Sequence, residues 1–385
     1  MTVEVLESGL YTTIQDKGRY GYQAAGIPVS GAMDSFALQV ANRLVGNETN
    51  RGALEMTLQG PTLLFEEDCE VAITGADMTP TLNDQPVPLW VNLYIPKGSI
   101  LRFGYAQKGC HTYLAVAKGW KVPEKFGSTS TYVRGAIGGY HGRVIKRGDI
   151  LLLNQNQVNQ EAEKKMELRA LEPNRTPQYN NKIKVAVIAG PQAEYFTDEA
   201  WQTFYRQVYR LTTAANRMGY PLEPVEGKLL TRKSNKEMIS DATAVGAIQV
   251  PPNGQPIVLM ADRQTTGGYP KIATVISAHI SRIAQAQPGS LIQFAKTDLS
   301  RAHQLARQQQ KVIEEKIITG AKGKEAWLEQ ALLQRRKVIA QIEKRKGQEK
   351  IIYSITWEKE NVGNEKKSKN IFHQKAVIYP EIIDS

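Results

Sequence analysis

The stretch Val71-Ala72-Ile73-Thr74 decides the fold class, because it is a short run of β-branched and apolar residues bounded by turn signals. Comparable runs recur along the first 170 residues at Leu63-Leu64-Phe65, Ser99-Ile100-Leu101-Arg102-Phe103, Tyr113-Leu114-Ala115-Val116 and Ile150-Leu151-Leu152-Leu153. Strands this short at this spacing are typical of a β-barrel or sandwich. One helix is expected among them, because Asp34 can cap a segment that ends near Leu44 and has one mainly apolar side.

A stretch with two prolines and three asparagines, from Leu171 to Asn181, is typical of a linker between domains. The region after it is expected to be rich in strands, at 183–188, 247–250, 257–260 and 290–294, with helices at 198–209 and from Tyr269 to Ile283. We therefore predict three parts: a first β region over 1–172, a second β region over 180–298, and a basic, partly helical extension over 299–385. The pattern of residues 97–103 recurs weakly in residues 287–294, which permits two structurally related halves of the chain.

The formal net charge of +11 is concentrated in the extension. Residues 301–385 hold 18 Lys and Arg against 11 Asp and Glu, so this segment supplies +7 of the total. Its apolar residues, among them Trp327, Leu328 and Ile342, follow one helical stripe, interrupted near Gly320. We interpret the segment as an amphipathic helical hairpin that lies on the body or on a neighbouring protein of a complex, in preference to an RNA-binding or membrane-binding element. A short β-like piece is expected at 351–357, followed by a flexible run at 358–369.

The remaining composition indicates a cytoplasmic protein without a metal centre. The chain opens directly into an alternating strand pattern, and no window is long and apolar enough for a membrane span. Cys69 and Cys110 lack the spacing of a zinc or redox site, so both are expected to be buried, reduced thiols.

Two polar, glycine-bearing segments in the first region are candidates for ligand binding. The segment from Gln15 to Asp34 places charged and hydroxyl groups around glycines that allow backbone amides to approach a ligand, and its candidates are Gln15, Asp16, Arg19, Ser30 and Asp34. Asp34 has the alternative role of a helix cap, and Asp16 with Arg19 could form a surface ion pair. The second segment, Gly127 to Gly135, is rich in hydroxyl groups, and its candidates are Ser130 and Thr131. Hydroxyls in such turns often form hydrogen bonds with their own backbone instead.

A third segment, from Gln249 to Lys271, is the strongest candidate. Five consecutive polar residues, Asp262 to Thr266, follow an apolar strand, and Gly267-Gly268 then leads into an expected helix start. A strand-end loop that feeds a helix N-terminus offers free amides and positive potential to an anion. The binding candidates here are Gln249, Asn253, Gln264, Thr265, Thr266, Gly267, Gly268 and Tyr269. The segment lacks the spacing of a P-loop or a dinucleotide-binding loop.

These segments resemble the KipA family, also described as the second-subunit domain of allophanate hydrolase, as the C subunit of 5-oxoprolinase and as a biotin-dependent carboxyltransferase-like domain. The resemblance covers roughly residues 3 to 300 and is carried by the phrases at 18–21, 29–34, 41–47, 130–134, 216–220 and 246–271. It implies tandem cyclophilin-like β-barrels and a complex that opens 5-oxo-L-proline to L-glutamate with ATP. It also implies a KipI-like partner (the B subunit of 5-oxoprolinase) and a LamB/YcsF-like partner (the A subunit). The sequence departs from the family pattern at 221–227 and 242–245.

Residue types alone suggest roles in such a reaction. Arg263 and Lys271 could neutralise phosphoryl charge, Asp262 could manage a proton, and the neighbouring amides and hydroxyls could bind oxyanions of a small anionic substrate. Two alternatives remain open. One is carboxyl transfer of the urea carboxylase type, which needs a biotin-bearing partner because this chain has no biotinylation site of its own. The other is a non-catalytic protein that binds a KipI-like kinase inhibitor.

Overall fold

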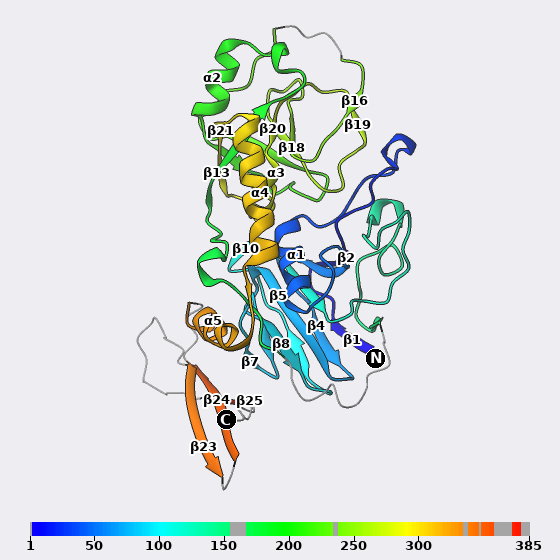
Figure 1. Cartoon of the computed structure of the whole chain (residues 1–385). Coiled ribbons are helices and arrows are strands. Elements are labelled where there is room, and N and C mark those ends of the chain that lie inside the picture. Colours follow the sequence, from blue (N-terminus) through cyan, green and yellow to red (C-terminus); the bar gives the residue numbers. More distant parts are fainter. Residues whose placement is uncertain are drawn as a thin grey trace, which may run out of the picture.

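A computed structural model describes residues 2–154, 167–233, 238–333, 338–345, 348–357 and 372–378 (Figure 1). The first region contains two antiparallel sheets. The six-stranded sheet has the order β11 (Ile150–Leu152), β1 (Thr2–Glu7), β4 (Thr62–Phe65), β9 (Ile100–Arg102), β6 (Thr81–Leu82) and β7 (Gln85–Pro86). The five-stranded sheet has the order β2 (Tyr11–Gln15), β3 (Ala53–Thr57), β10 (Lys108–Val116), β5 (Cys69–Asp77) and β8 (Asn92–Ile95).

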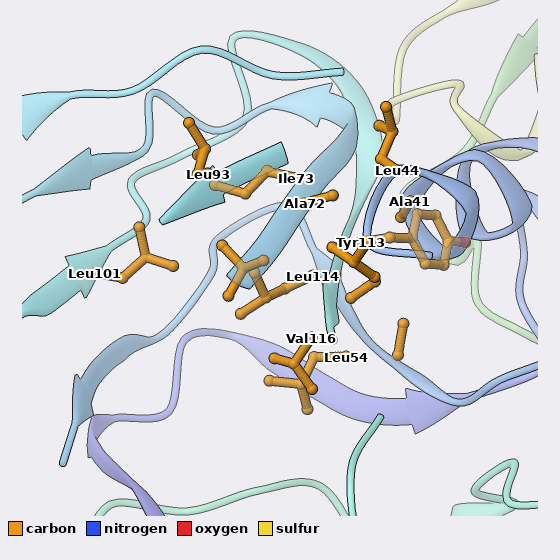
Figure 2. Close-up of a cluster of buried hydrophobic side chains, with 14 of the residues drawn as sticks. Ala41, Leu44, Leu54, Ala72, Ile73, Leu93, Leu101, Tyr113, Leu114 and Val116 are labelled. Carbon is orange, nitrogen blue, oxygen red and sulfur yellow. The ribbon is translucent and has the colours of Figure 1, made fainter. Parts of the chain in front are cut away.

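The core of the first region is built mainly from the inner faces of these strands and from the helix that follows Asp34. Figure 2 shows Ile73 and Leu93 together with Leu101 and Leu114, which come from four different strands. The helix α1 (Ser35–Leu44) adds Ala41 and Leu44 to the same cluster (Figure 2). Asp34 caps this helix, because its carboxylate accepts a hydrogen bond from the amide of Ala37 at 3.0 Å. The predicted helix and its cap are therefore confirmed.

The second region is a closed, seven-stranded barrel. Its strand order is β13 (Lys182–Ala189), β20 (Lys271–Val275), β17 (Ala247–Gln249), β18 (Ile257–Leu259), β15 (Gly219–Pro224), β14 (Tyr209–Leu211) and β21 (Leu291–Lys296). The expectation of a mainly β protein with a few helices and barrel architecture is confirmed. The helix predicted at 198–209 is α2 (Asp198–Arg206), and Tyr209 already belongs to β14. The division at 172, 180 and 298 stays a prediction.

The helix expected from Tyr269 to Ile283 is wrong in its first half. Residues Lys271–Val275 form β20, and only Ser277–Ala284 are helical, as α3. Strand β20 pairs with both β13 and β17 and so closes the barrel. The β-branched residues Ile272, Thr274 and Val275 favour this extended state.

The extension begins as expected and then departs from the prediction. Helix α4 (Leu299–Glu315) lies along the body beside α3 and also contacts α1 (Figure 1). Strand β22 (Ile317–Ile318) pairs with β12 (Ala170–Leu171), and α5 (Gly320–Leu333) packs on β12.

The helical stripe predicted through Ile342 is wrong, since β23 (Val338–Arg345), β24 (Gln348–Trp357) and β25 (Phe372–Ile378) form a sheet. The piece expected at 351–357 is confirmed as part of β24, whereas 358–369 lies outside the described residues. No helix in the described ranges is long and apolar enough to cross a membrane.

One side chain of the first region belongs to the core of the second. Met33, which precedes α1, is 1% exposed and packs within the cluster formed by the barrel residues. The two regions are therefore joined by apolar packing as well as by the chain.

Replacing Met33 with alanine should lower the free energy of unfolding by about 2–5 kcal/mol, because the deletion leaves a cavity inside the barrel core. Urea unfolding, monitored by circular dichroism, measures the change. Met33→Leu is the control, since it keeps the volume and should cost less than about 1.5 kcal/mol. Equal stability of the alanine variant and the wild type would contradict this packing.

Candidate functional site

The first two polar segments of the sequence meet around the carboxylate of Asp16. This side chain is 7% exposed and accepts hydrogen bonds from the hydroxyls of Ser128 (2.7 Å) and Ser130 and from the amide of Thr129 (2.6 Å). The hydroxyl of Thr131 donates to the carbonyl of Ile14 at 2.9 Å. The alternative of a surface ion pair for Asp16 is therefore wrong. The hydroxyls of Ser130 and Thr131 hold their loop in place, and a role for them in substrate binding stays a prediction.

Glycines allow the backbone of residues 16–19 to run against that of residues 29–32. The amide of Arg19 donates to the carbonyl of Val29 at 2.8 Å, and the amide of Ala32 donates to the carbonyl of Asp16 at 2.9 Å. Gly18 and Gly31 have positive φ angles of 98° and 89°. A Cβ atom on Gly31 would lie only 2.9 Å from the backbone nitrogen of Gly18. The glycines therefore serve this close approach of two chain segments.

Arg19 is fully buried in this cluster, yet most of its guanidinium is unsatisfied. Its Nη2 donates to the carbonyl of Ser130, whereas its Nε and Nη1 have no hydrogen-bond partner among the described residues. Gln15 Oε1 and Ser30 Oγ, which belong to the two chain segments that meet here, also lack partners among those residues. Burial lowers the pKa of Arg19, while the charges of Asp16 and Asp262 raise it. Buried polar groups without partners are rare in proteins, and a bound ligand, ion or water is one explanation for them.

A buried ion cluster joins this site to the second region. Arg217 donates from Nε and Nη2 to the two carboxylate oxygens of Asp262, at 2.9 and 3.0 Å, and from Nη1 to the carboxylate of Glu55. The same guanidinium donates to the carbonyl of Gly31 at 2.7 Å. The hydroxyl of Tyr113 donates to the second oxygen of Glu55 at 2.6 Å. Although burial opposes its charge, the carboxylates of Asp262 and Glu55 raise the pKa of Arg217.

The third polar segment divides into two groups with different partners. Asp262 faces Arg217, while the Lys271 amine lies 3.1 Å from the Asp241 carboxylate, as an ion pair rather than an aligned hydrogen bond. Gln249 pairs with Lys271 in the barrel sheet and so belongs to the second group. Its side chain accepts a hydrogen bond from Gln264 at 3.3 Å and lies beside Gly267. The predicted helix N-terminus after Gly267-Gly268 is wrong, because the chain enters strand β20 there.

The other candidates of this segment lie nearer the surface. Thr266–Gly267 form β19, which pairs with β16 (Asp241–Ala242), and Thr266, Gly268 and Tyr269 are exposed. The exposed amide of Asn253 bonds only within its own turn, to Gln255. Arg263 donates to the carbonyls of Thr243 and Met260, both at 3.4 Å, and burial lowers its pKa.

Asp34 combines its capping role with a contact between the regions. Its second oxygen accepts a hydrogen bond from Gln285 at 2.8 Å, and Gln285 also accepts from the amides of Cys110 (2.8 Å) and His111 (2.9 Å). Burial raises the pKa of Asp34 in spite of these bonds. The structure therefore uses Asp34 to fix the junction.

His111 is a buried histidine at the same junction. Its Nε2 lies 3.3 Å from the Tyr220 hydroxyl, and its Nδ1 lies 3.1 Å from the Thr57 hydroxyl. Burial lowers its pKa to about 4. The ring is therefore neutral near pH 7 and acts as a structural hydrogen-bonding group.

Sequence reasoning missed the residues that connect the regions: Glu55, His111, Tyr113, Arg217 and Gln285. Arg217 lies within one of the phrases that resemble the family, and this resemblance was the signal that could have identified it.

Both cysteines are buried and unpaired, as predicted, and burial raises the pKa of each thiol to about 12. Across the described ranges, no three His, Cys, Asp or Glu side chains gather as a metal site would require.

Comparison with known proteins gives a consistent result. The family described as carboxyltransferase domain, subdomain A and B, matches residues 25–296. The C subunit of 5-oxoprolinase from Escherichia coli is 38% identical over 313 residues, covering 81% of this chain and 97% of the relative. A urea amidolyase of Lachancea kluyveri is 33% identical over 81% of this chain but only 18% of the relative. The crystal structure of the K. lactis urea amidolyase superposes with a TM-score of 0.76 at 28% identity, over 92% of this chain and 23% of that one.

Acidification should weaken the fold through His111. The pKa of His111 is near 6.5 in the unfolded state and near 4 in the folded state. The stability that the neutral His111 contributes is therefore fully present above pH 6.5 and is lost as the pH falls to about 4. The loss amounts to at most about 3 kcal/mol. Urea midpoints between pH 7 and 4 should fall less steeply for His111→Gln than for the wild type, with a residual slope from His279, whose pKa is also about 4. The exposed His303→Gln serves as the control, and an unchanged slope in His111→Gln would refute the assignment.

Proposed function

This chain belongs to the family of the carboxyltransferase domain, subdomains A and B, and is homologous to the C subunit of 5-oxoprolinase; on that premise we propose that it is one component of an ATP-dependent 5-oxoprolinase. The complex would open 5-oxo-L-proline to L-glutamate in the cytoplasm. Its other members would be the KipI-like B subunit and the LamB/YcsF-like A subunit. The coverage of 97% of the E. coli relative supports this assignment over the match to a small part of the urea amidolyases.

The observation that carries the proposal is a set of buried polar atoms on Arg19, Ser30 and Gln15 that have no hydrogen-bond partner in the described part of the chain. Arg19 and Ser30 provide hydrogen-bond donors, and Gln15 provides an acceptor through Oε1. The substrate 5-oxoproline is a carboxylate that also carries a lactam N–H. We assign its carboxylate to Arg19 and Ser30, because charge-assisted hydrogen bonds to a guanidinium are the strong ones. The lactam N–H is assigned to Gln15.

The surrounding charges fit a small anion at this position. Asp16 is hydrogen-bonded to hydroxyls and amides, and Asp262 is hydrogen-bonded to Arg217. Burial lowers the pKa of Arg19 and these two carboxylates raise it, but its Nε and Nη1 have no hydrogen-bond partner among the described residues. Because Arg19 is fully buried, the substrate must displace part of the chain to reach it. The exposed loop 20–26 follows Arg19 directly, and its Gly21 and Gly26 have positive φ angles of 94° and 77°. This loop is the segment that we expect to move.

The chemistry proposed for the reaction needs ATP as a co-substrate of the complex. Transfer of the terminal phosphoryl group of ATP to the lactam oxygen makes the ring carbon electrophilic. Attack by one water then breaks the C–N bond and leaves an acyl phosphate, and a second water hydrolyses this acyl phosphate to glutamate and free phosphate. Arg263 lies in the polar segment that follows β18 and is the cation that we place near the phosphoryl group. A catalytic role for Asp262 is indirect in this proposal, since Asp262 orients Arg217. Lys271 forms an ion pair with Asp241 and belongs to the other of the two groups in the third polar segment, away from Asp262.

Carboxyl transfer is the second candidate, favoured by the urea amidolyase relatives and by the structural match. It would require a biotin-bearing partner. Streptavidin detection of a biotinylated protein that co-purifies with this chain would support it.

The proposed activity predicts that this chain, mixed with its KipI-like and LamB/YcsF-like partners, releases glutamate from 5-oxoproline only when ATP is present. Glutamate and ADP should form in equal amounts, and omission of any one of the three proteins should abolish both. Turnover by the two partners alone would contradict the proposal. A chain that binds the KipI-like partner but adds no turnover would instead support the non-catalytic alternative.

The Arg19→Lys variant should raise the KM for 5-oxoproline in the reconstituted complex by about 10-fold to 100-fold, because it loses charge-assisted hydrogen bonds worth about 1.5–3 kcal/mol. It should also lose most of the preference for 5-oxoproline over 2-pyrrolidinone, which lacks the carboxylate. The exposed Arg43→Lys, on α1, is the matched control. A fall in kcat with unchanged KM and unchanged preference would assign Arg19 a structural role instead.

A further inference from the structure

A cavity of about 490 Å³ lies outside the Arg19 site, where the two regions meet the extension. Its floor is the outer face of β13, and its sides are the start of α1, the face of α3 and the linker residues 175–180. Helix α4 forms the roof through Leu305, Gln309 and Val312. Figure 1 shows α4 lying along β13 and α3. Helix α4 lies beyond the matched residues 25–296, so part of this cavity is built by the extension.

The fold directs positive charge into this cavity. Strand β13 buries Val185 and Val187 in the barrel core, so the alternating residues Lys182 and Lys184 face outward, toward α4. Arg282 on α3 and Arg175 in the linker add two further cations to the lining. Within the described part of the chain, Lys182, Lys184 and Arg282 have no carboxylate partner, whereas Arg175 lies 3.5 Å from Glu172.

The single carboxylate in the lining does not balance these charges. Asp34 is buried and already accepts hydrogen bonds from Ala37 and Gln285. Unpaired cations that converge on a concave surface create a positive potential, which attracts anions of complementary charge. Three cations without a carboxylate partner among the described residues, Lys182, Lys184 and Arg282, favour a ligand with more than one negative charge.

The remaining lining adds polar and apolar groups suited to an organic ligand. His279 accepts a hydrogen bond from the amide of Ala186 at its Nδ1 (2.9 Å), so the neutral ring carries its proton on Nε2 as a donor. Phe36, Leu305 and Val312 supply an apolar wall, and Asn180 and Gln309 supply amides. The volume falls in the range of about 300–1,000 Å³ that small-molecule sites occupy.

We propose that this cavity binds a small organic phosphate of nucleotide size, with its phosphates near Lys182, Lys184 and Arg282 and its apolar part against Phe36, Leu305 and Val312. Phosphate is the anion that combines multiple negative charge with several strong acceptor oxygens. The site is separate from Arg19, and its existence does not depend on the proposed 5-oxoprolinase activity.

Isothermal titration of the full chain with ADP and with pyrophosphate tests the proposal. Both probes should bind at one saturable site, ADP more tightly because it also contacts the apolar wall, and binding should weaken as salt is added. Equal affinity of the two probes would contradict the apolar contact. Absence of saturable binding at millimolar concentrations would overturn the proposal.

Substitutions that add a negative charge at two positions of one helix provide a matched comparison. Gln309→Glu places a negative charge in the roof without changing the side-chain volume, and it should weaken ADP binding about tenfold, the effect of about 1.4 kcal/mol. Gln308→Glu makes the same change at an exposed position of α4 and should leave the affinity unchanged. Equal weakening by both variants would indicate only general attraction by a basic protein and would overturn the site.

Two further variants locate the phosphates and separate this site from the proposed active site. The double variant Lys182→Ala, Lys184→Ala should lower ADP affinity at least tenfold, whereas Lys296→Ala, an exposed lysine on the adjacent strand β21, should not. Arg19→Lys should leave ADP binding intact. Loss of ADP binding in Arg19→Lys, with retention in the double variant, would place the nucleotide at the Arg19 site and contradict this proposal.

Discussion

The buried ion cluster centred on Arg217 is the interaction on which the arrangement of the two regions depends. Arg217 comes from the turn before β15 in the barrel, and it holds Glu55 on β3, the Gly31 carbonyl and Asp262 at once. Removing charges from water is costly, and the cost is offset here because every one of these groups has a hydrogen-bonding partner. Loss of one member would leave the others buried and uncompensated, a change that typically costs about 3–5 kcal/mol. The cluster therefore selects one relative orientation of the regions, and with it the neighbourhood of Arg19.

The sequence predicted well those features that depend on local pattern. The short strands, the helix after Asp34 and its cap follow from residue type and spacing along a few residues. The errors came where long-range pairing decides the structure. Lys271–Val275 could continue into a helix, yet two neighbouring strands recruit it into the barrel. Residues 338–345 fit an apolar helical stripe, but hairpin pairing with β24 makes them a strand.

The candidate site shows the same division between local and distant information. Glycine and hydroxyl content singled out the segments around Asp16 and Ser130, and these segments do meet, although many of their polar groups bond one another. What sequence could not reveal is which groups remain without partners. Sequence does not distinguish Gln15, Arg19 and Ser30 from Asp16 and Ser128. Only the fold shows that some polar atoms of the first three have no hydrogen-bond partner among the described residues. The partners of Arg217 lie 162 and 45 residues away along the chain, beyond the reach of any motif.

The six residues from Val29 to Asp34 limit how this protein can be dissected. They include Gly31, whose carbonyl accepts from Arg217, and Met33, which packs in the barrel core. They also include Asp34, whose carboxylate accepts from Gln285. A fragment that contains only the barrel would lack all three and would present a hole beside the charges of Arg217 and Asp262. We therefore expect a barrel cut out at the linker to be less stable than the same barrel within the whole chain, because the cut removes all three of these contacts.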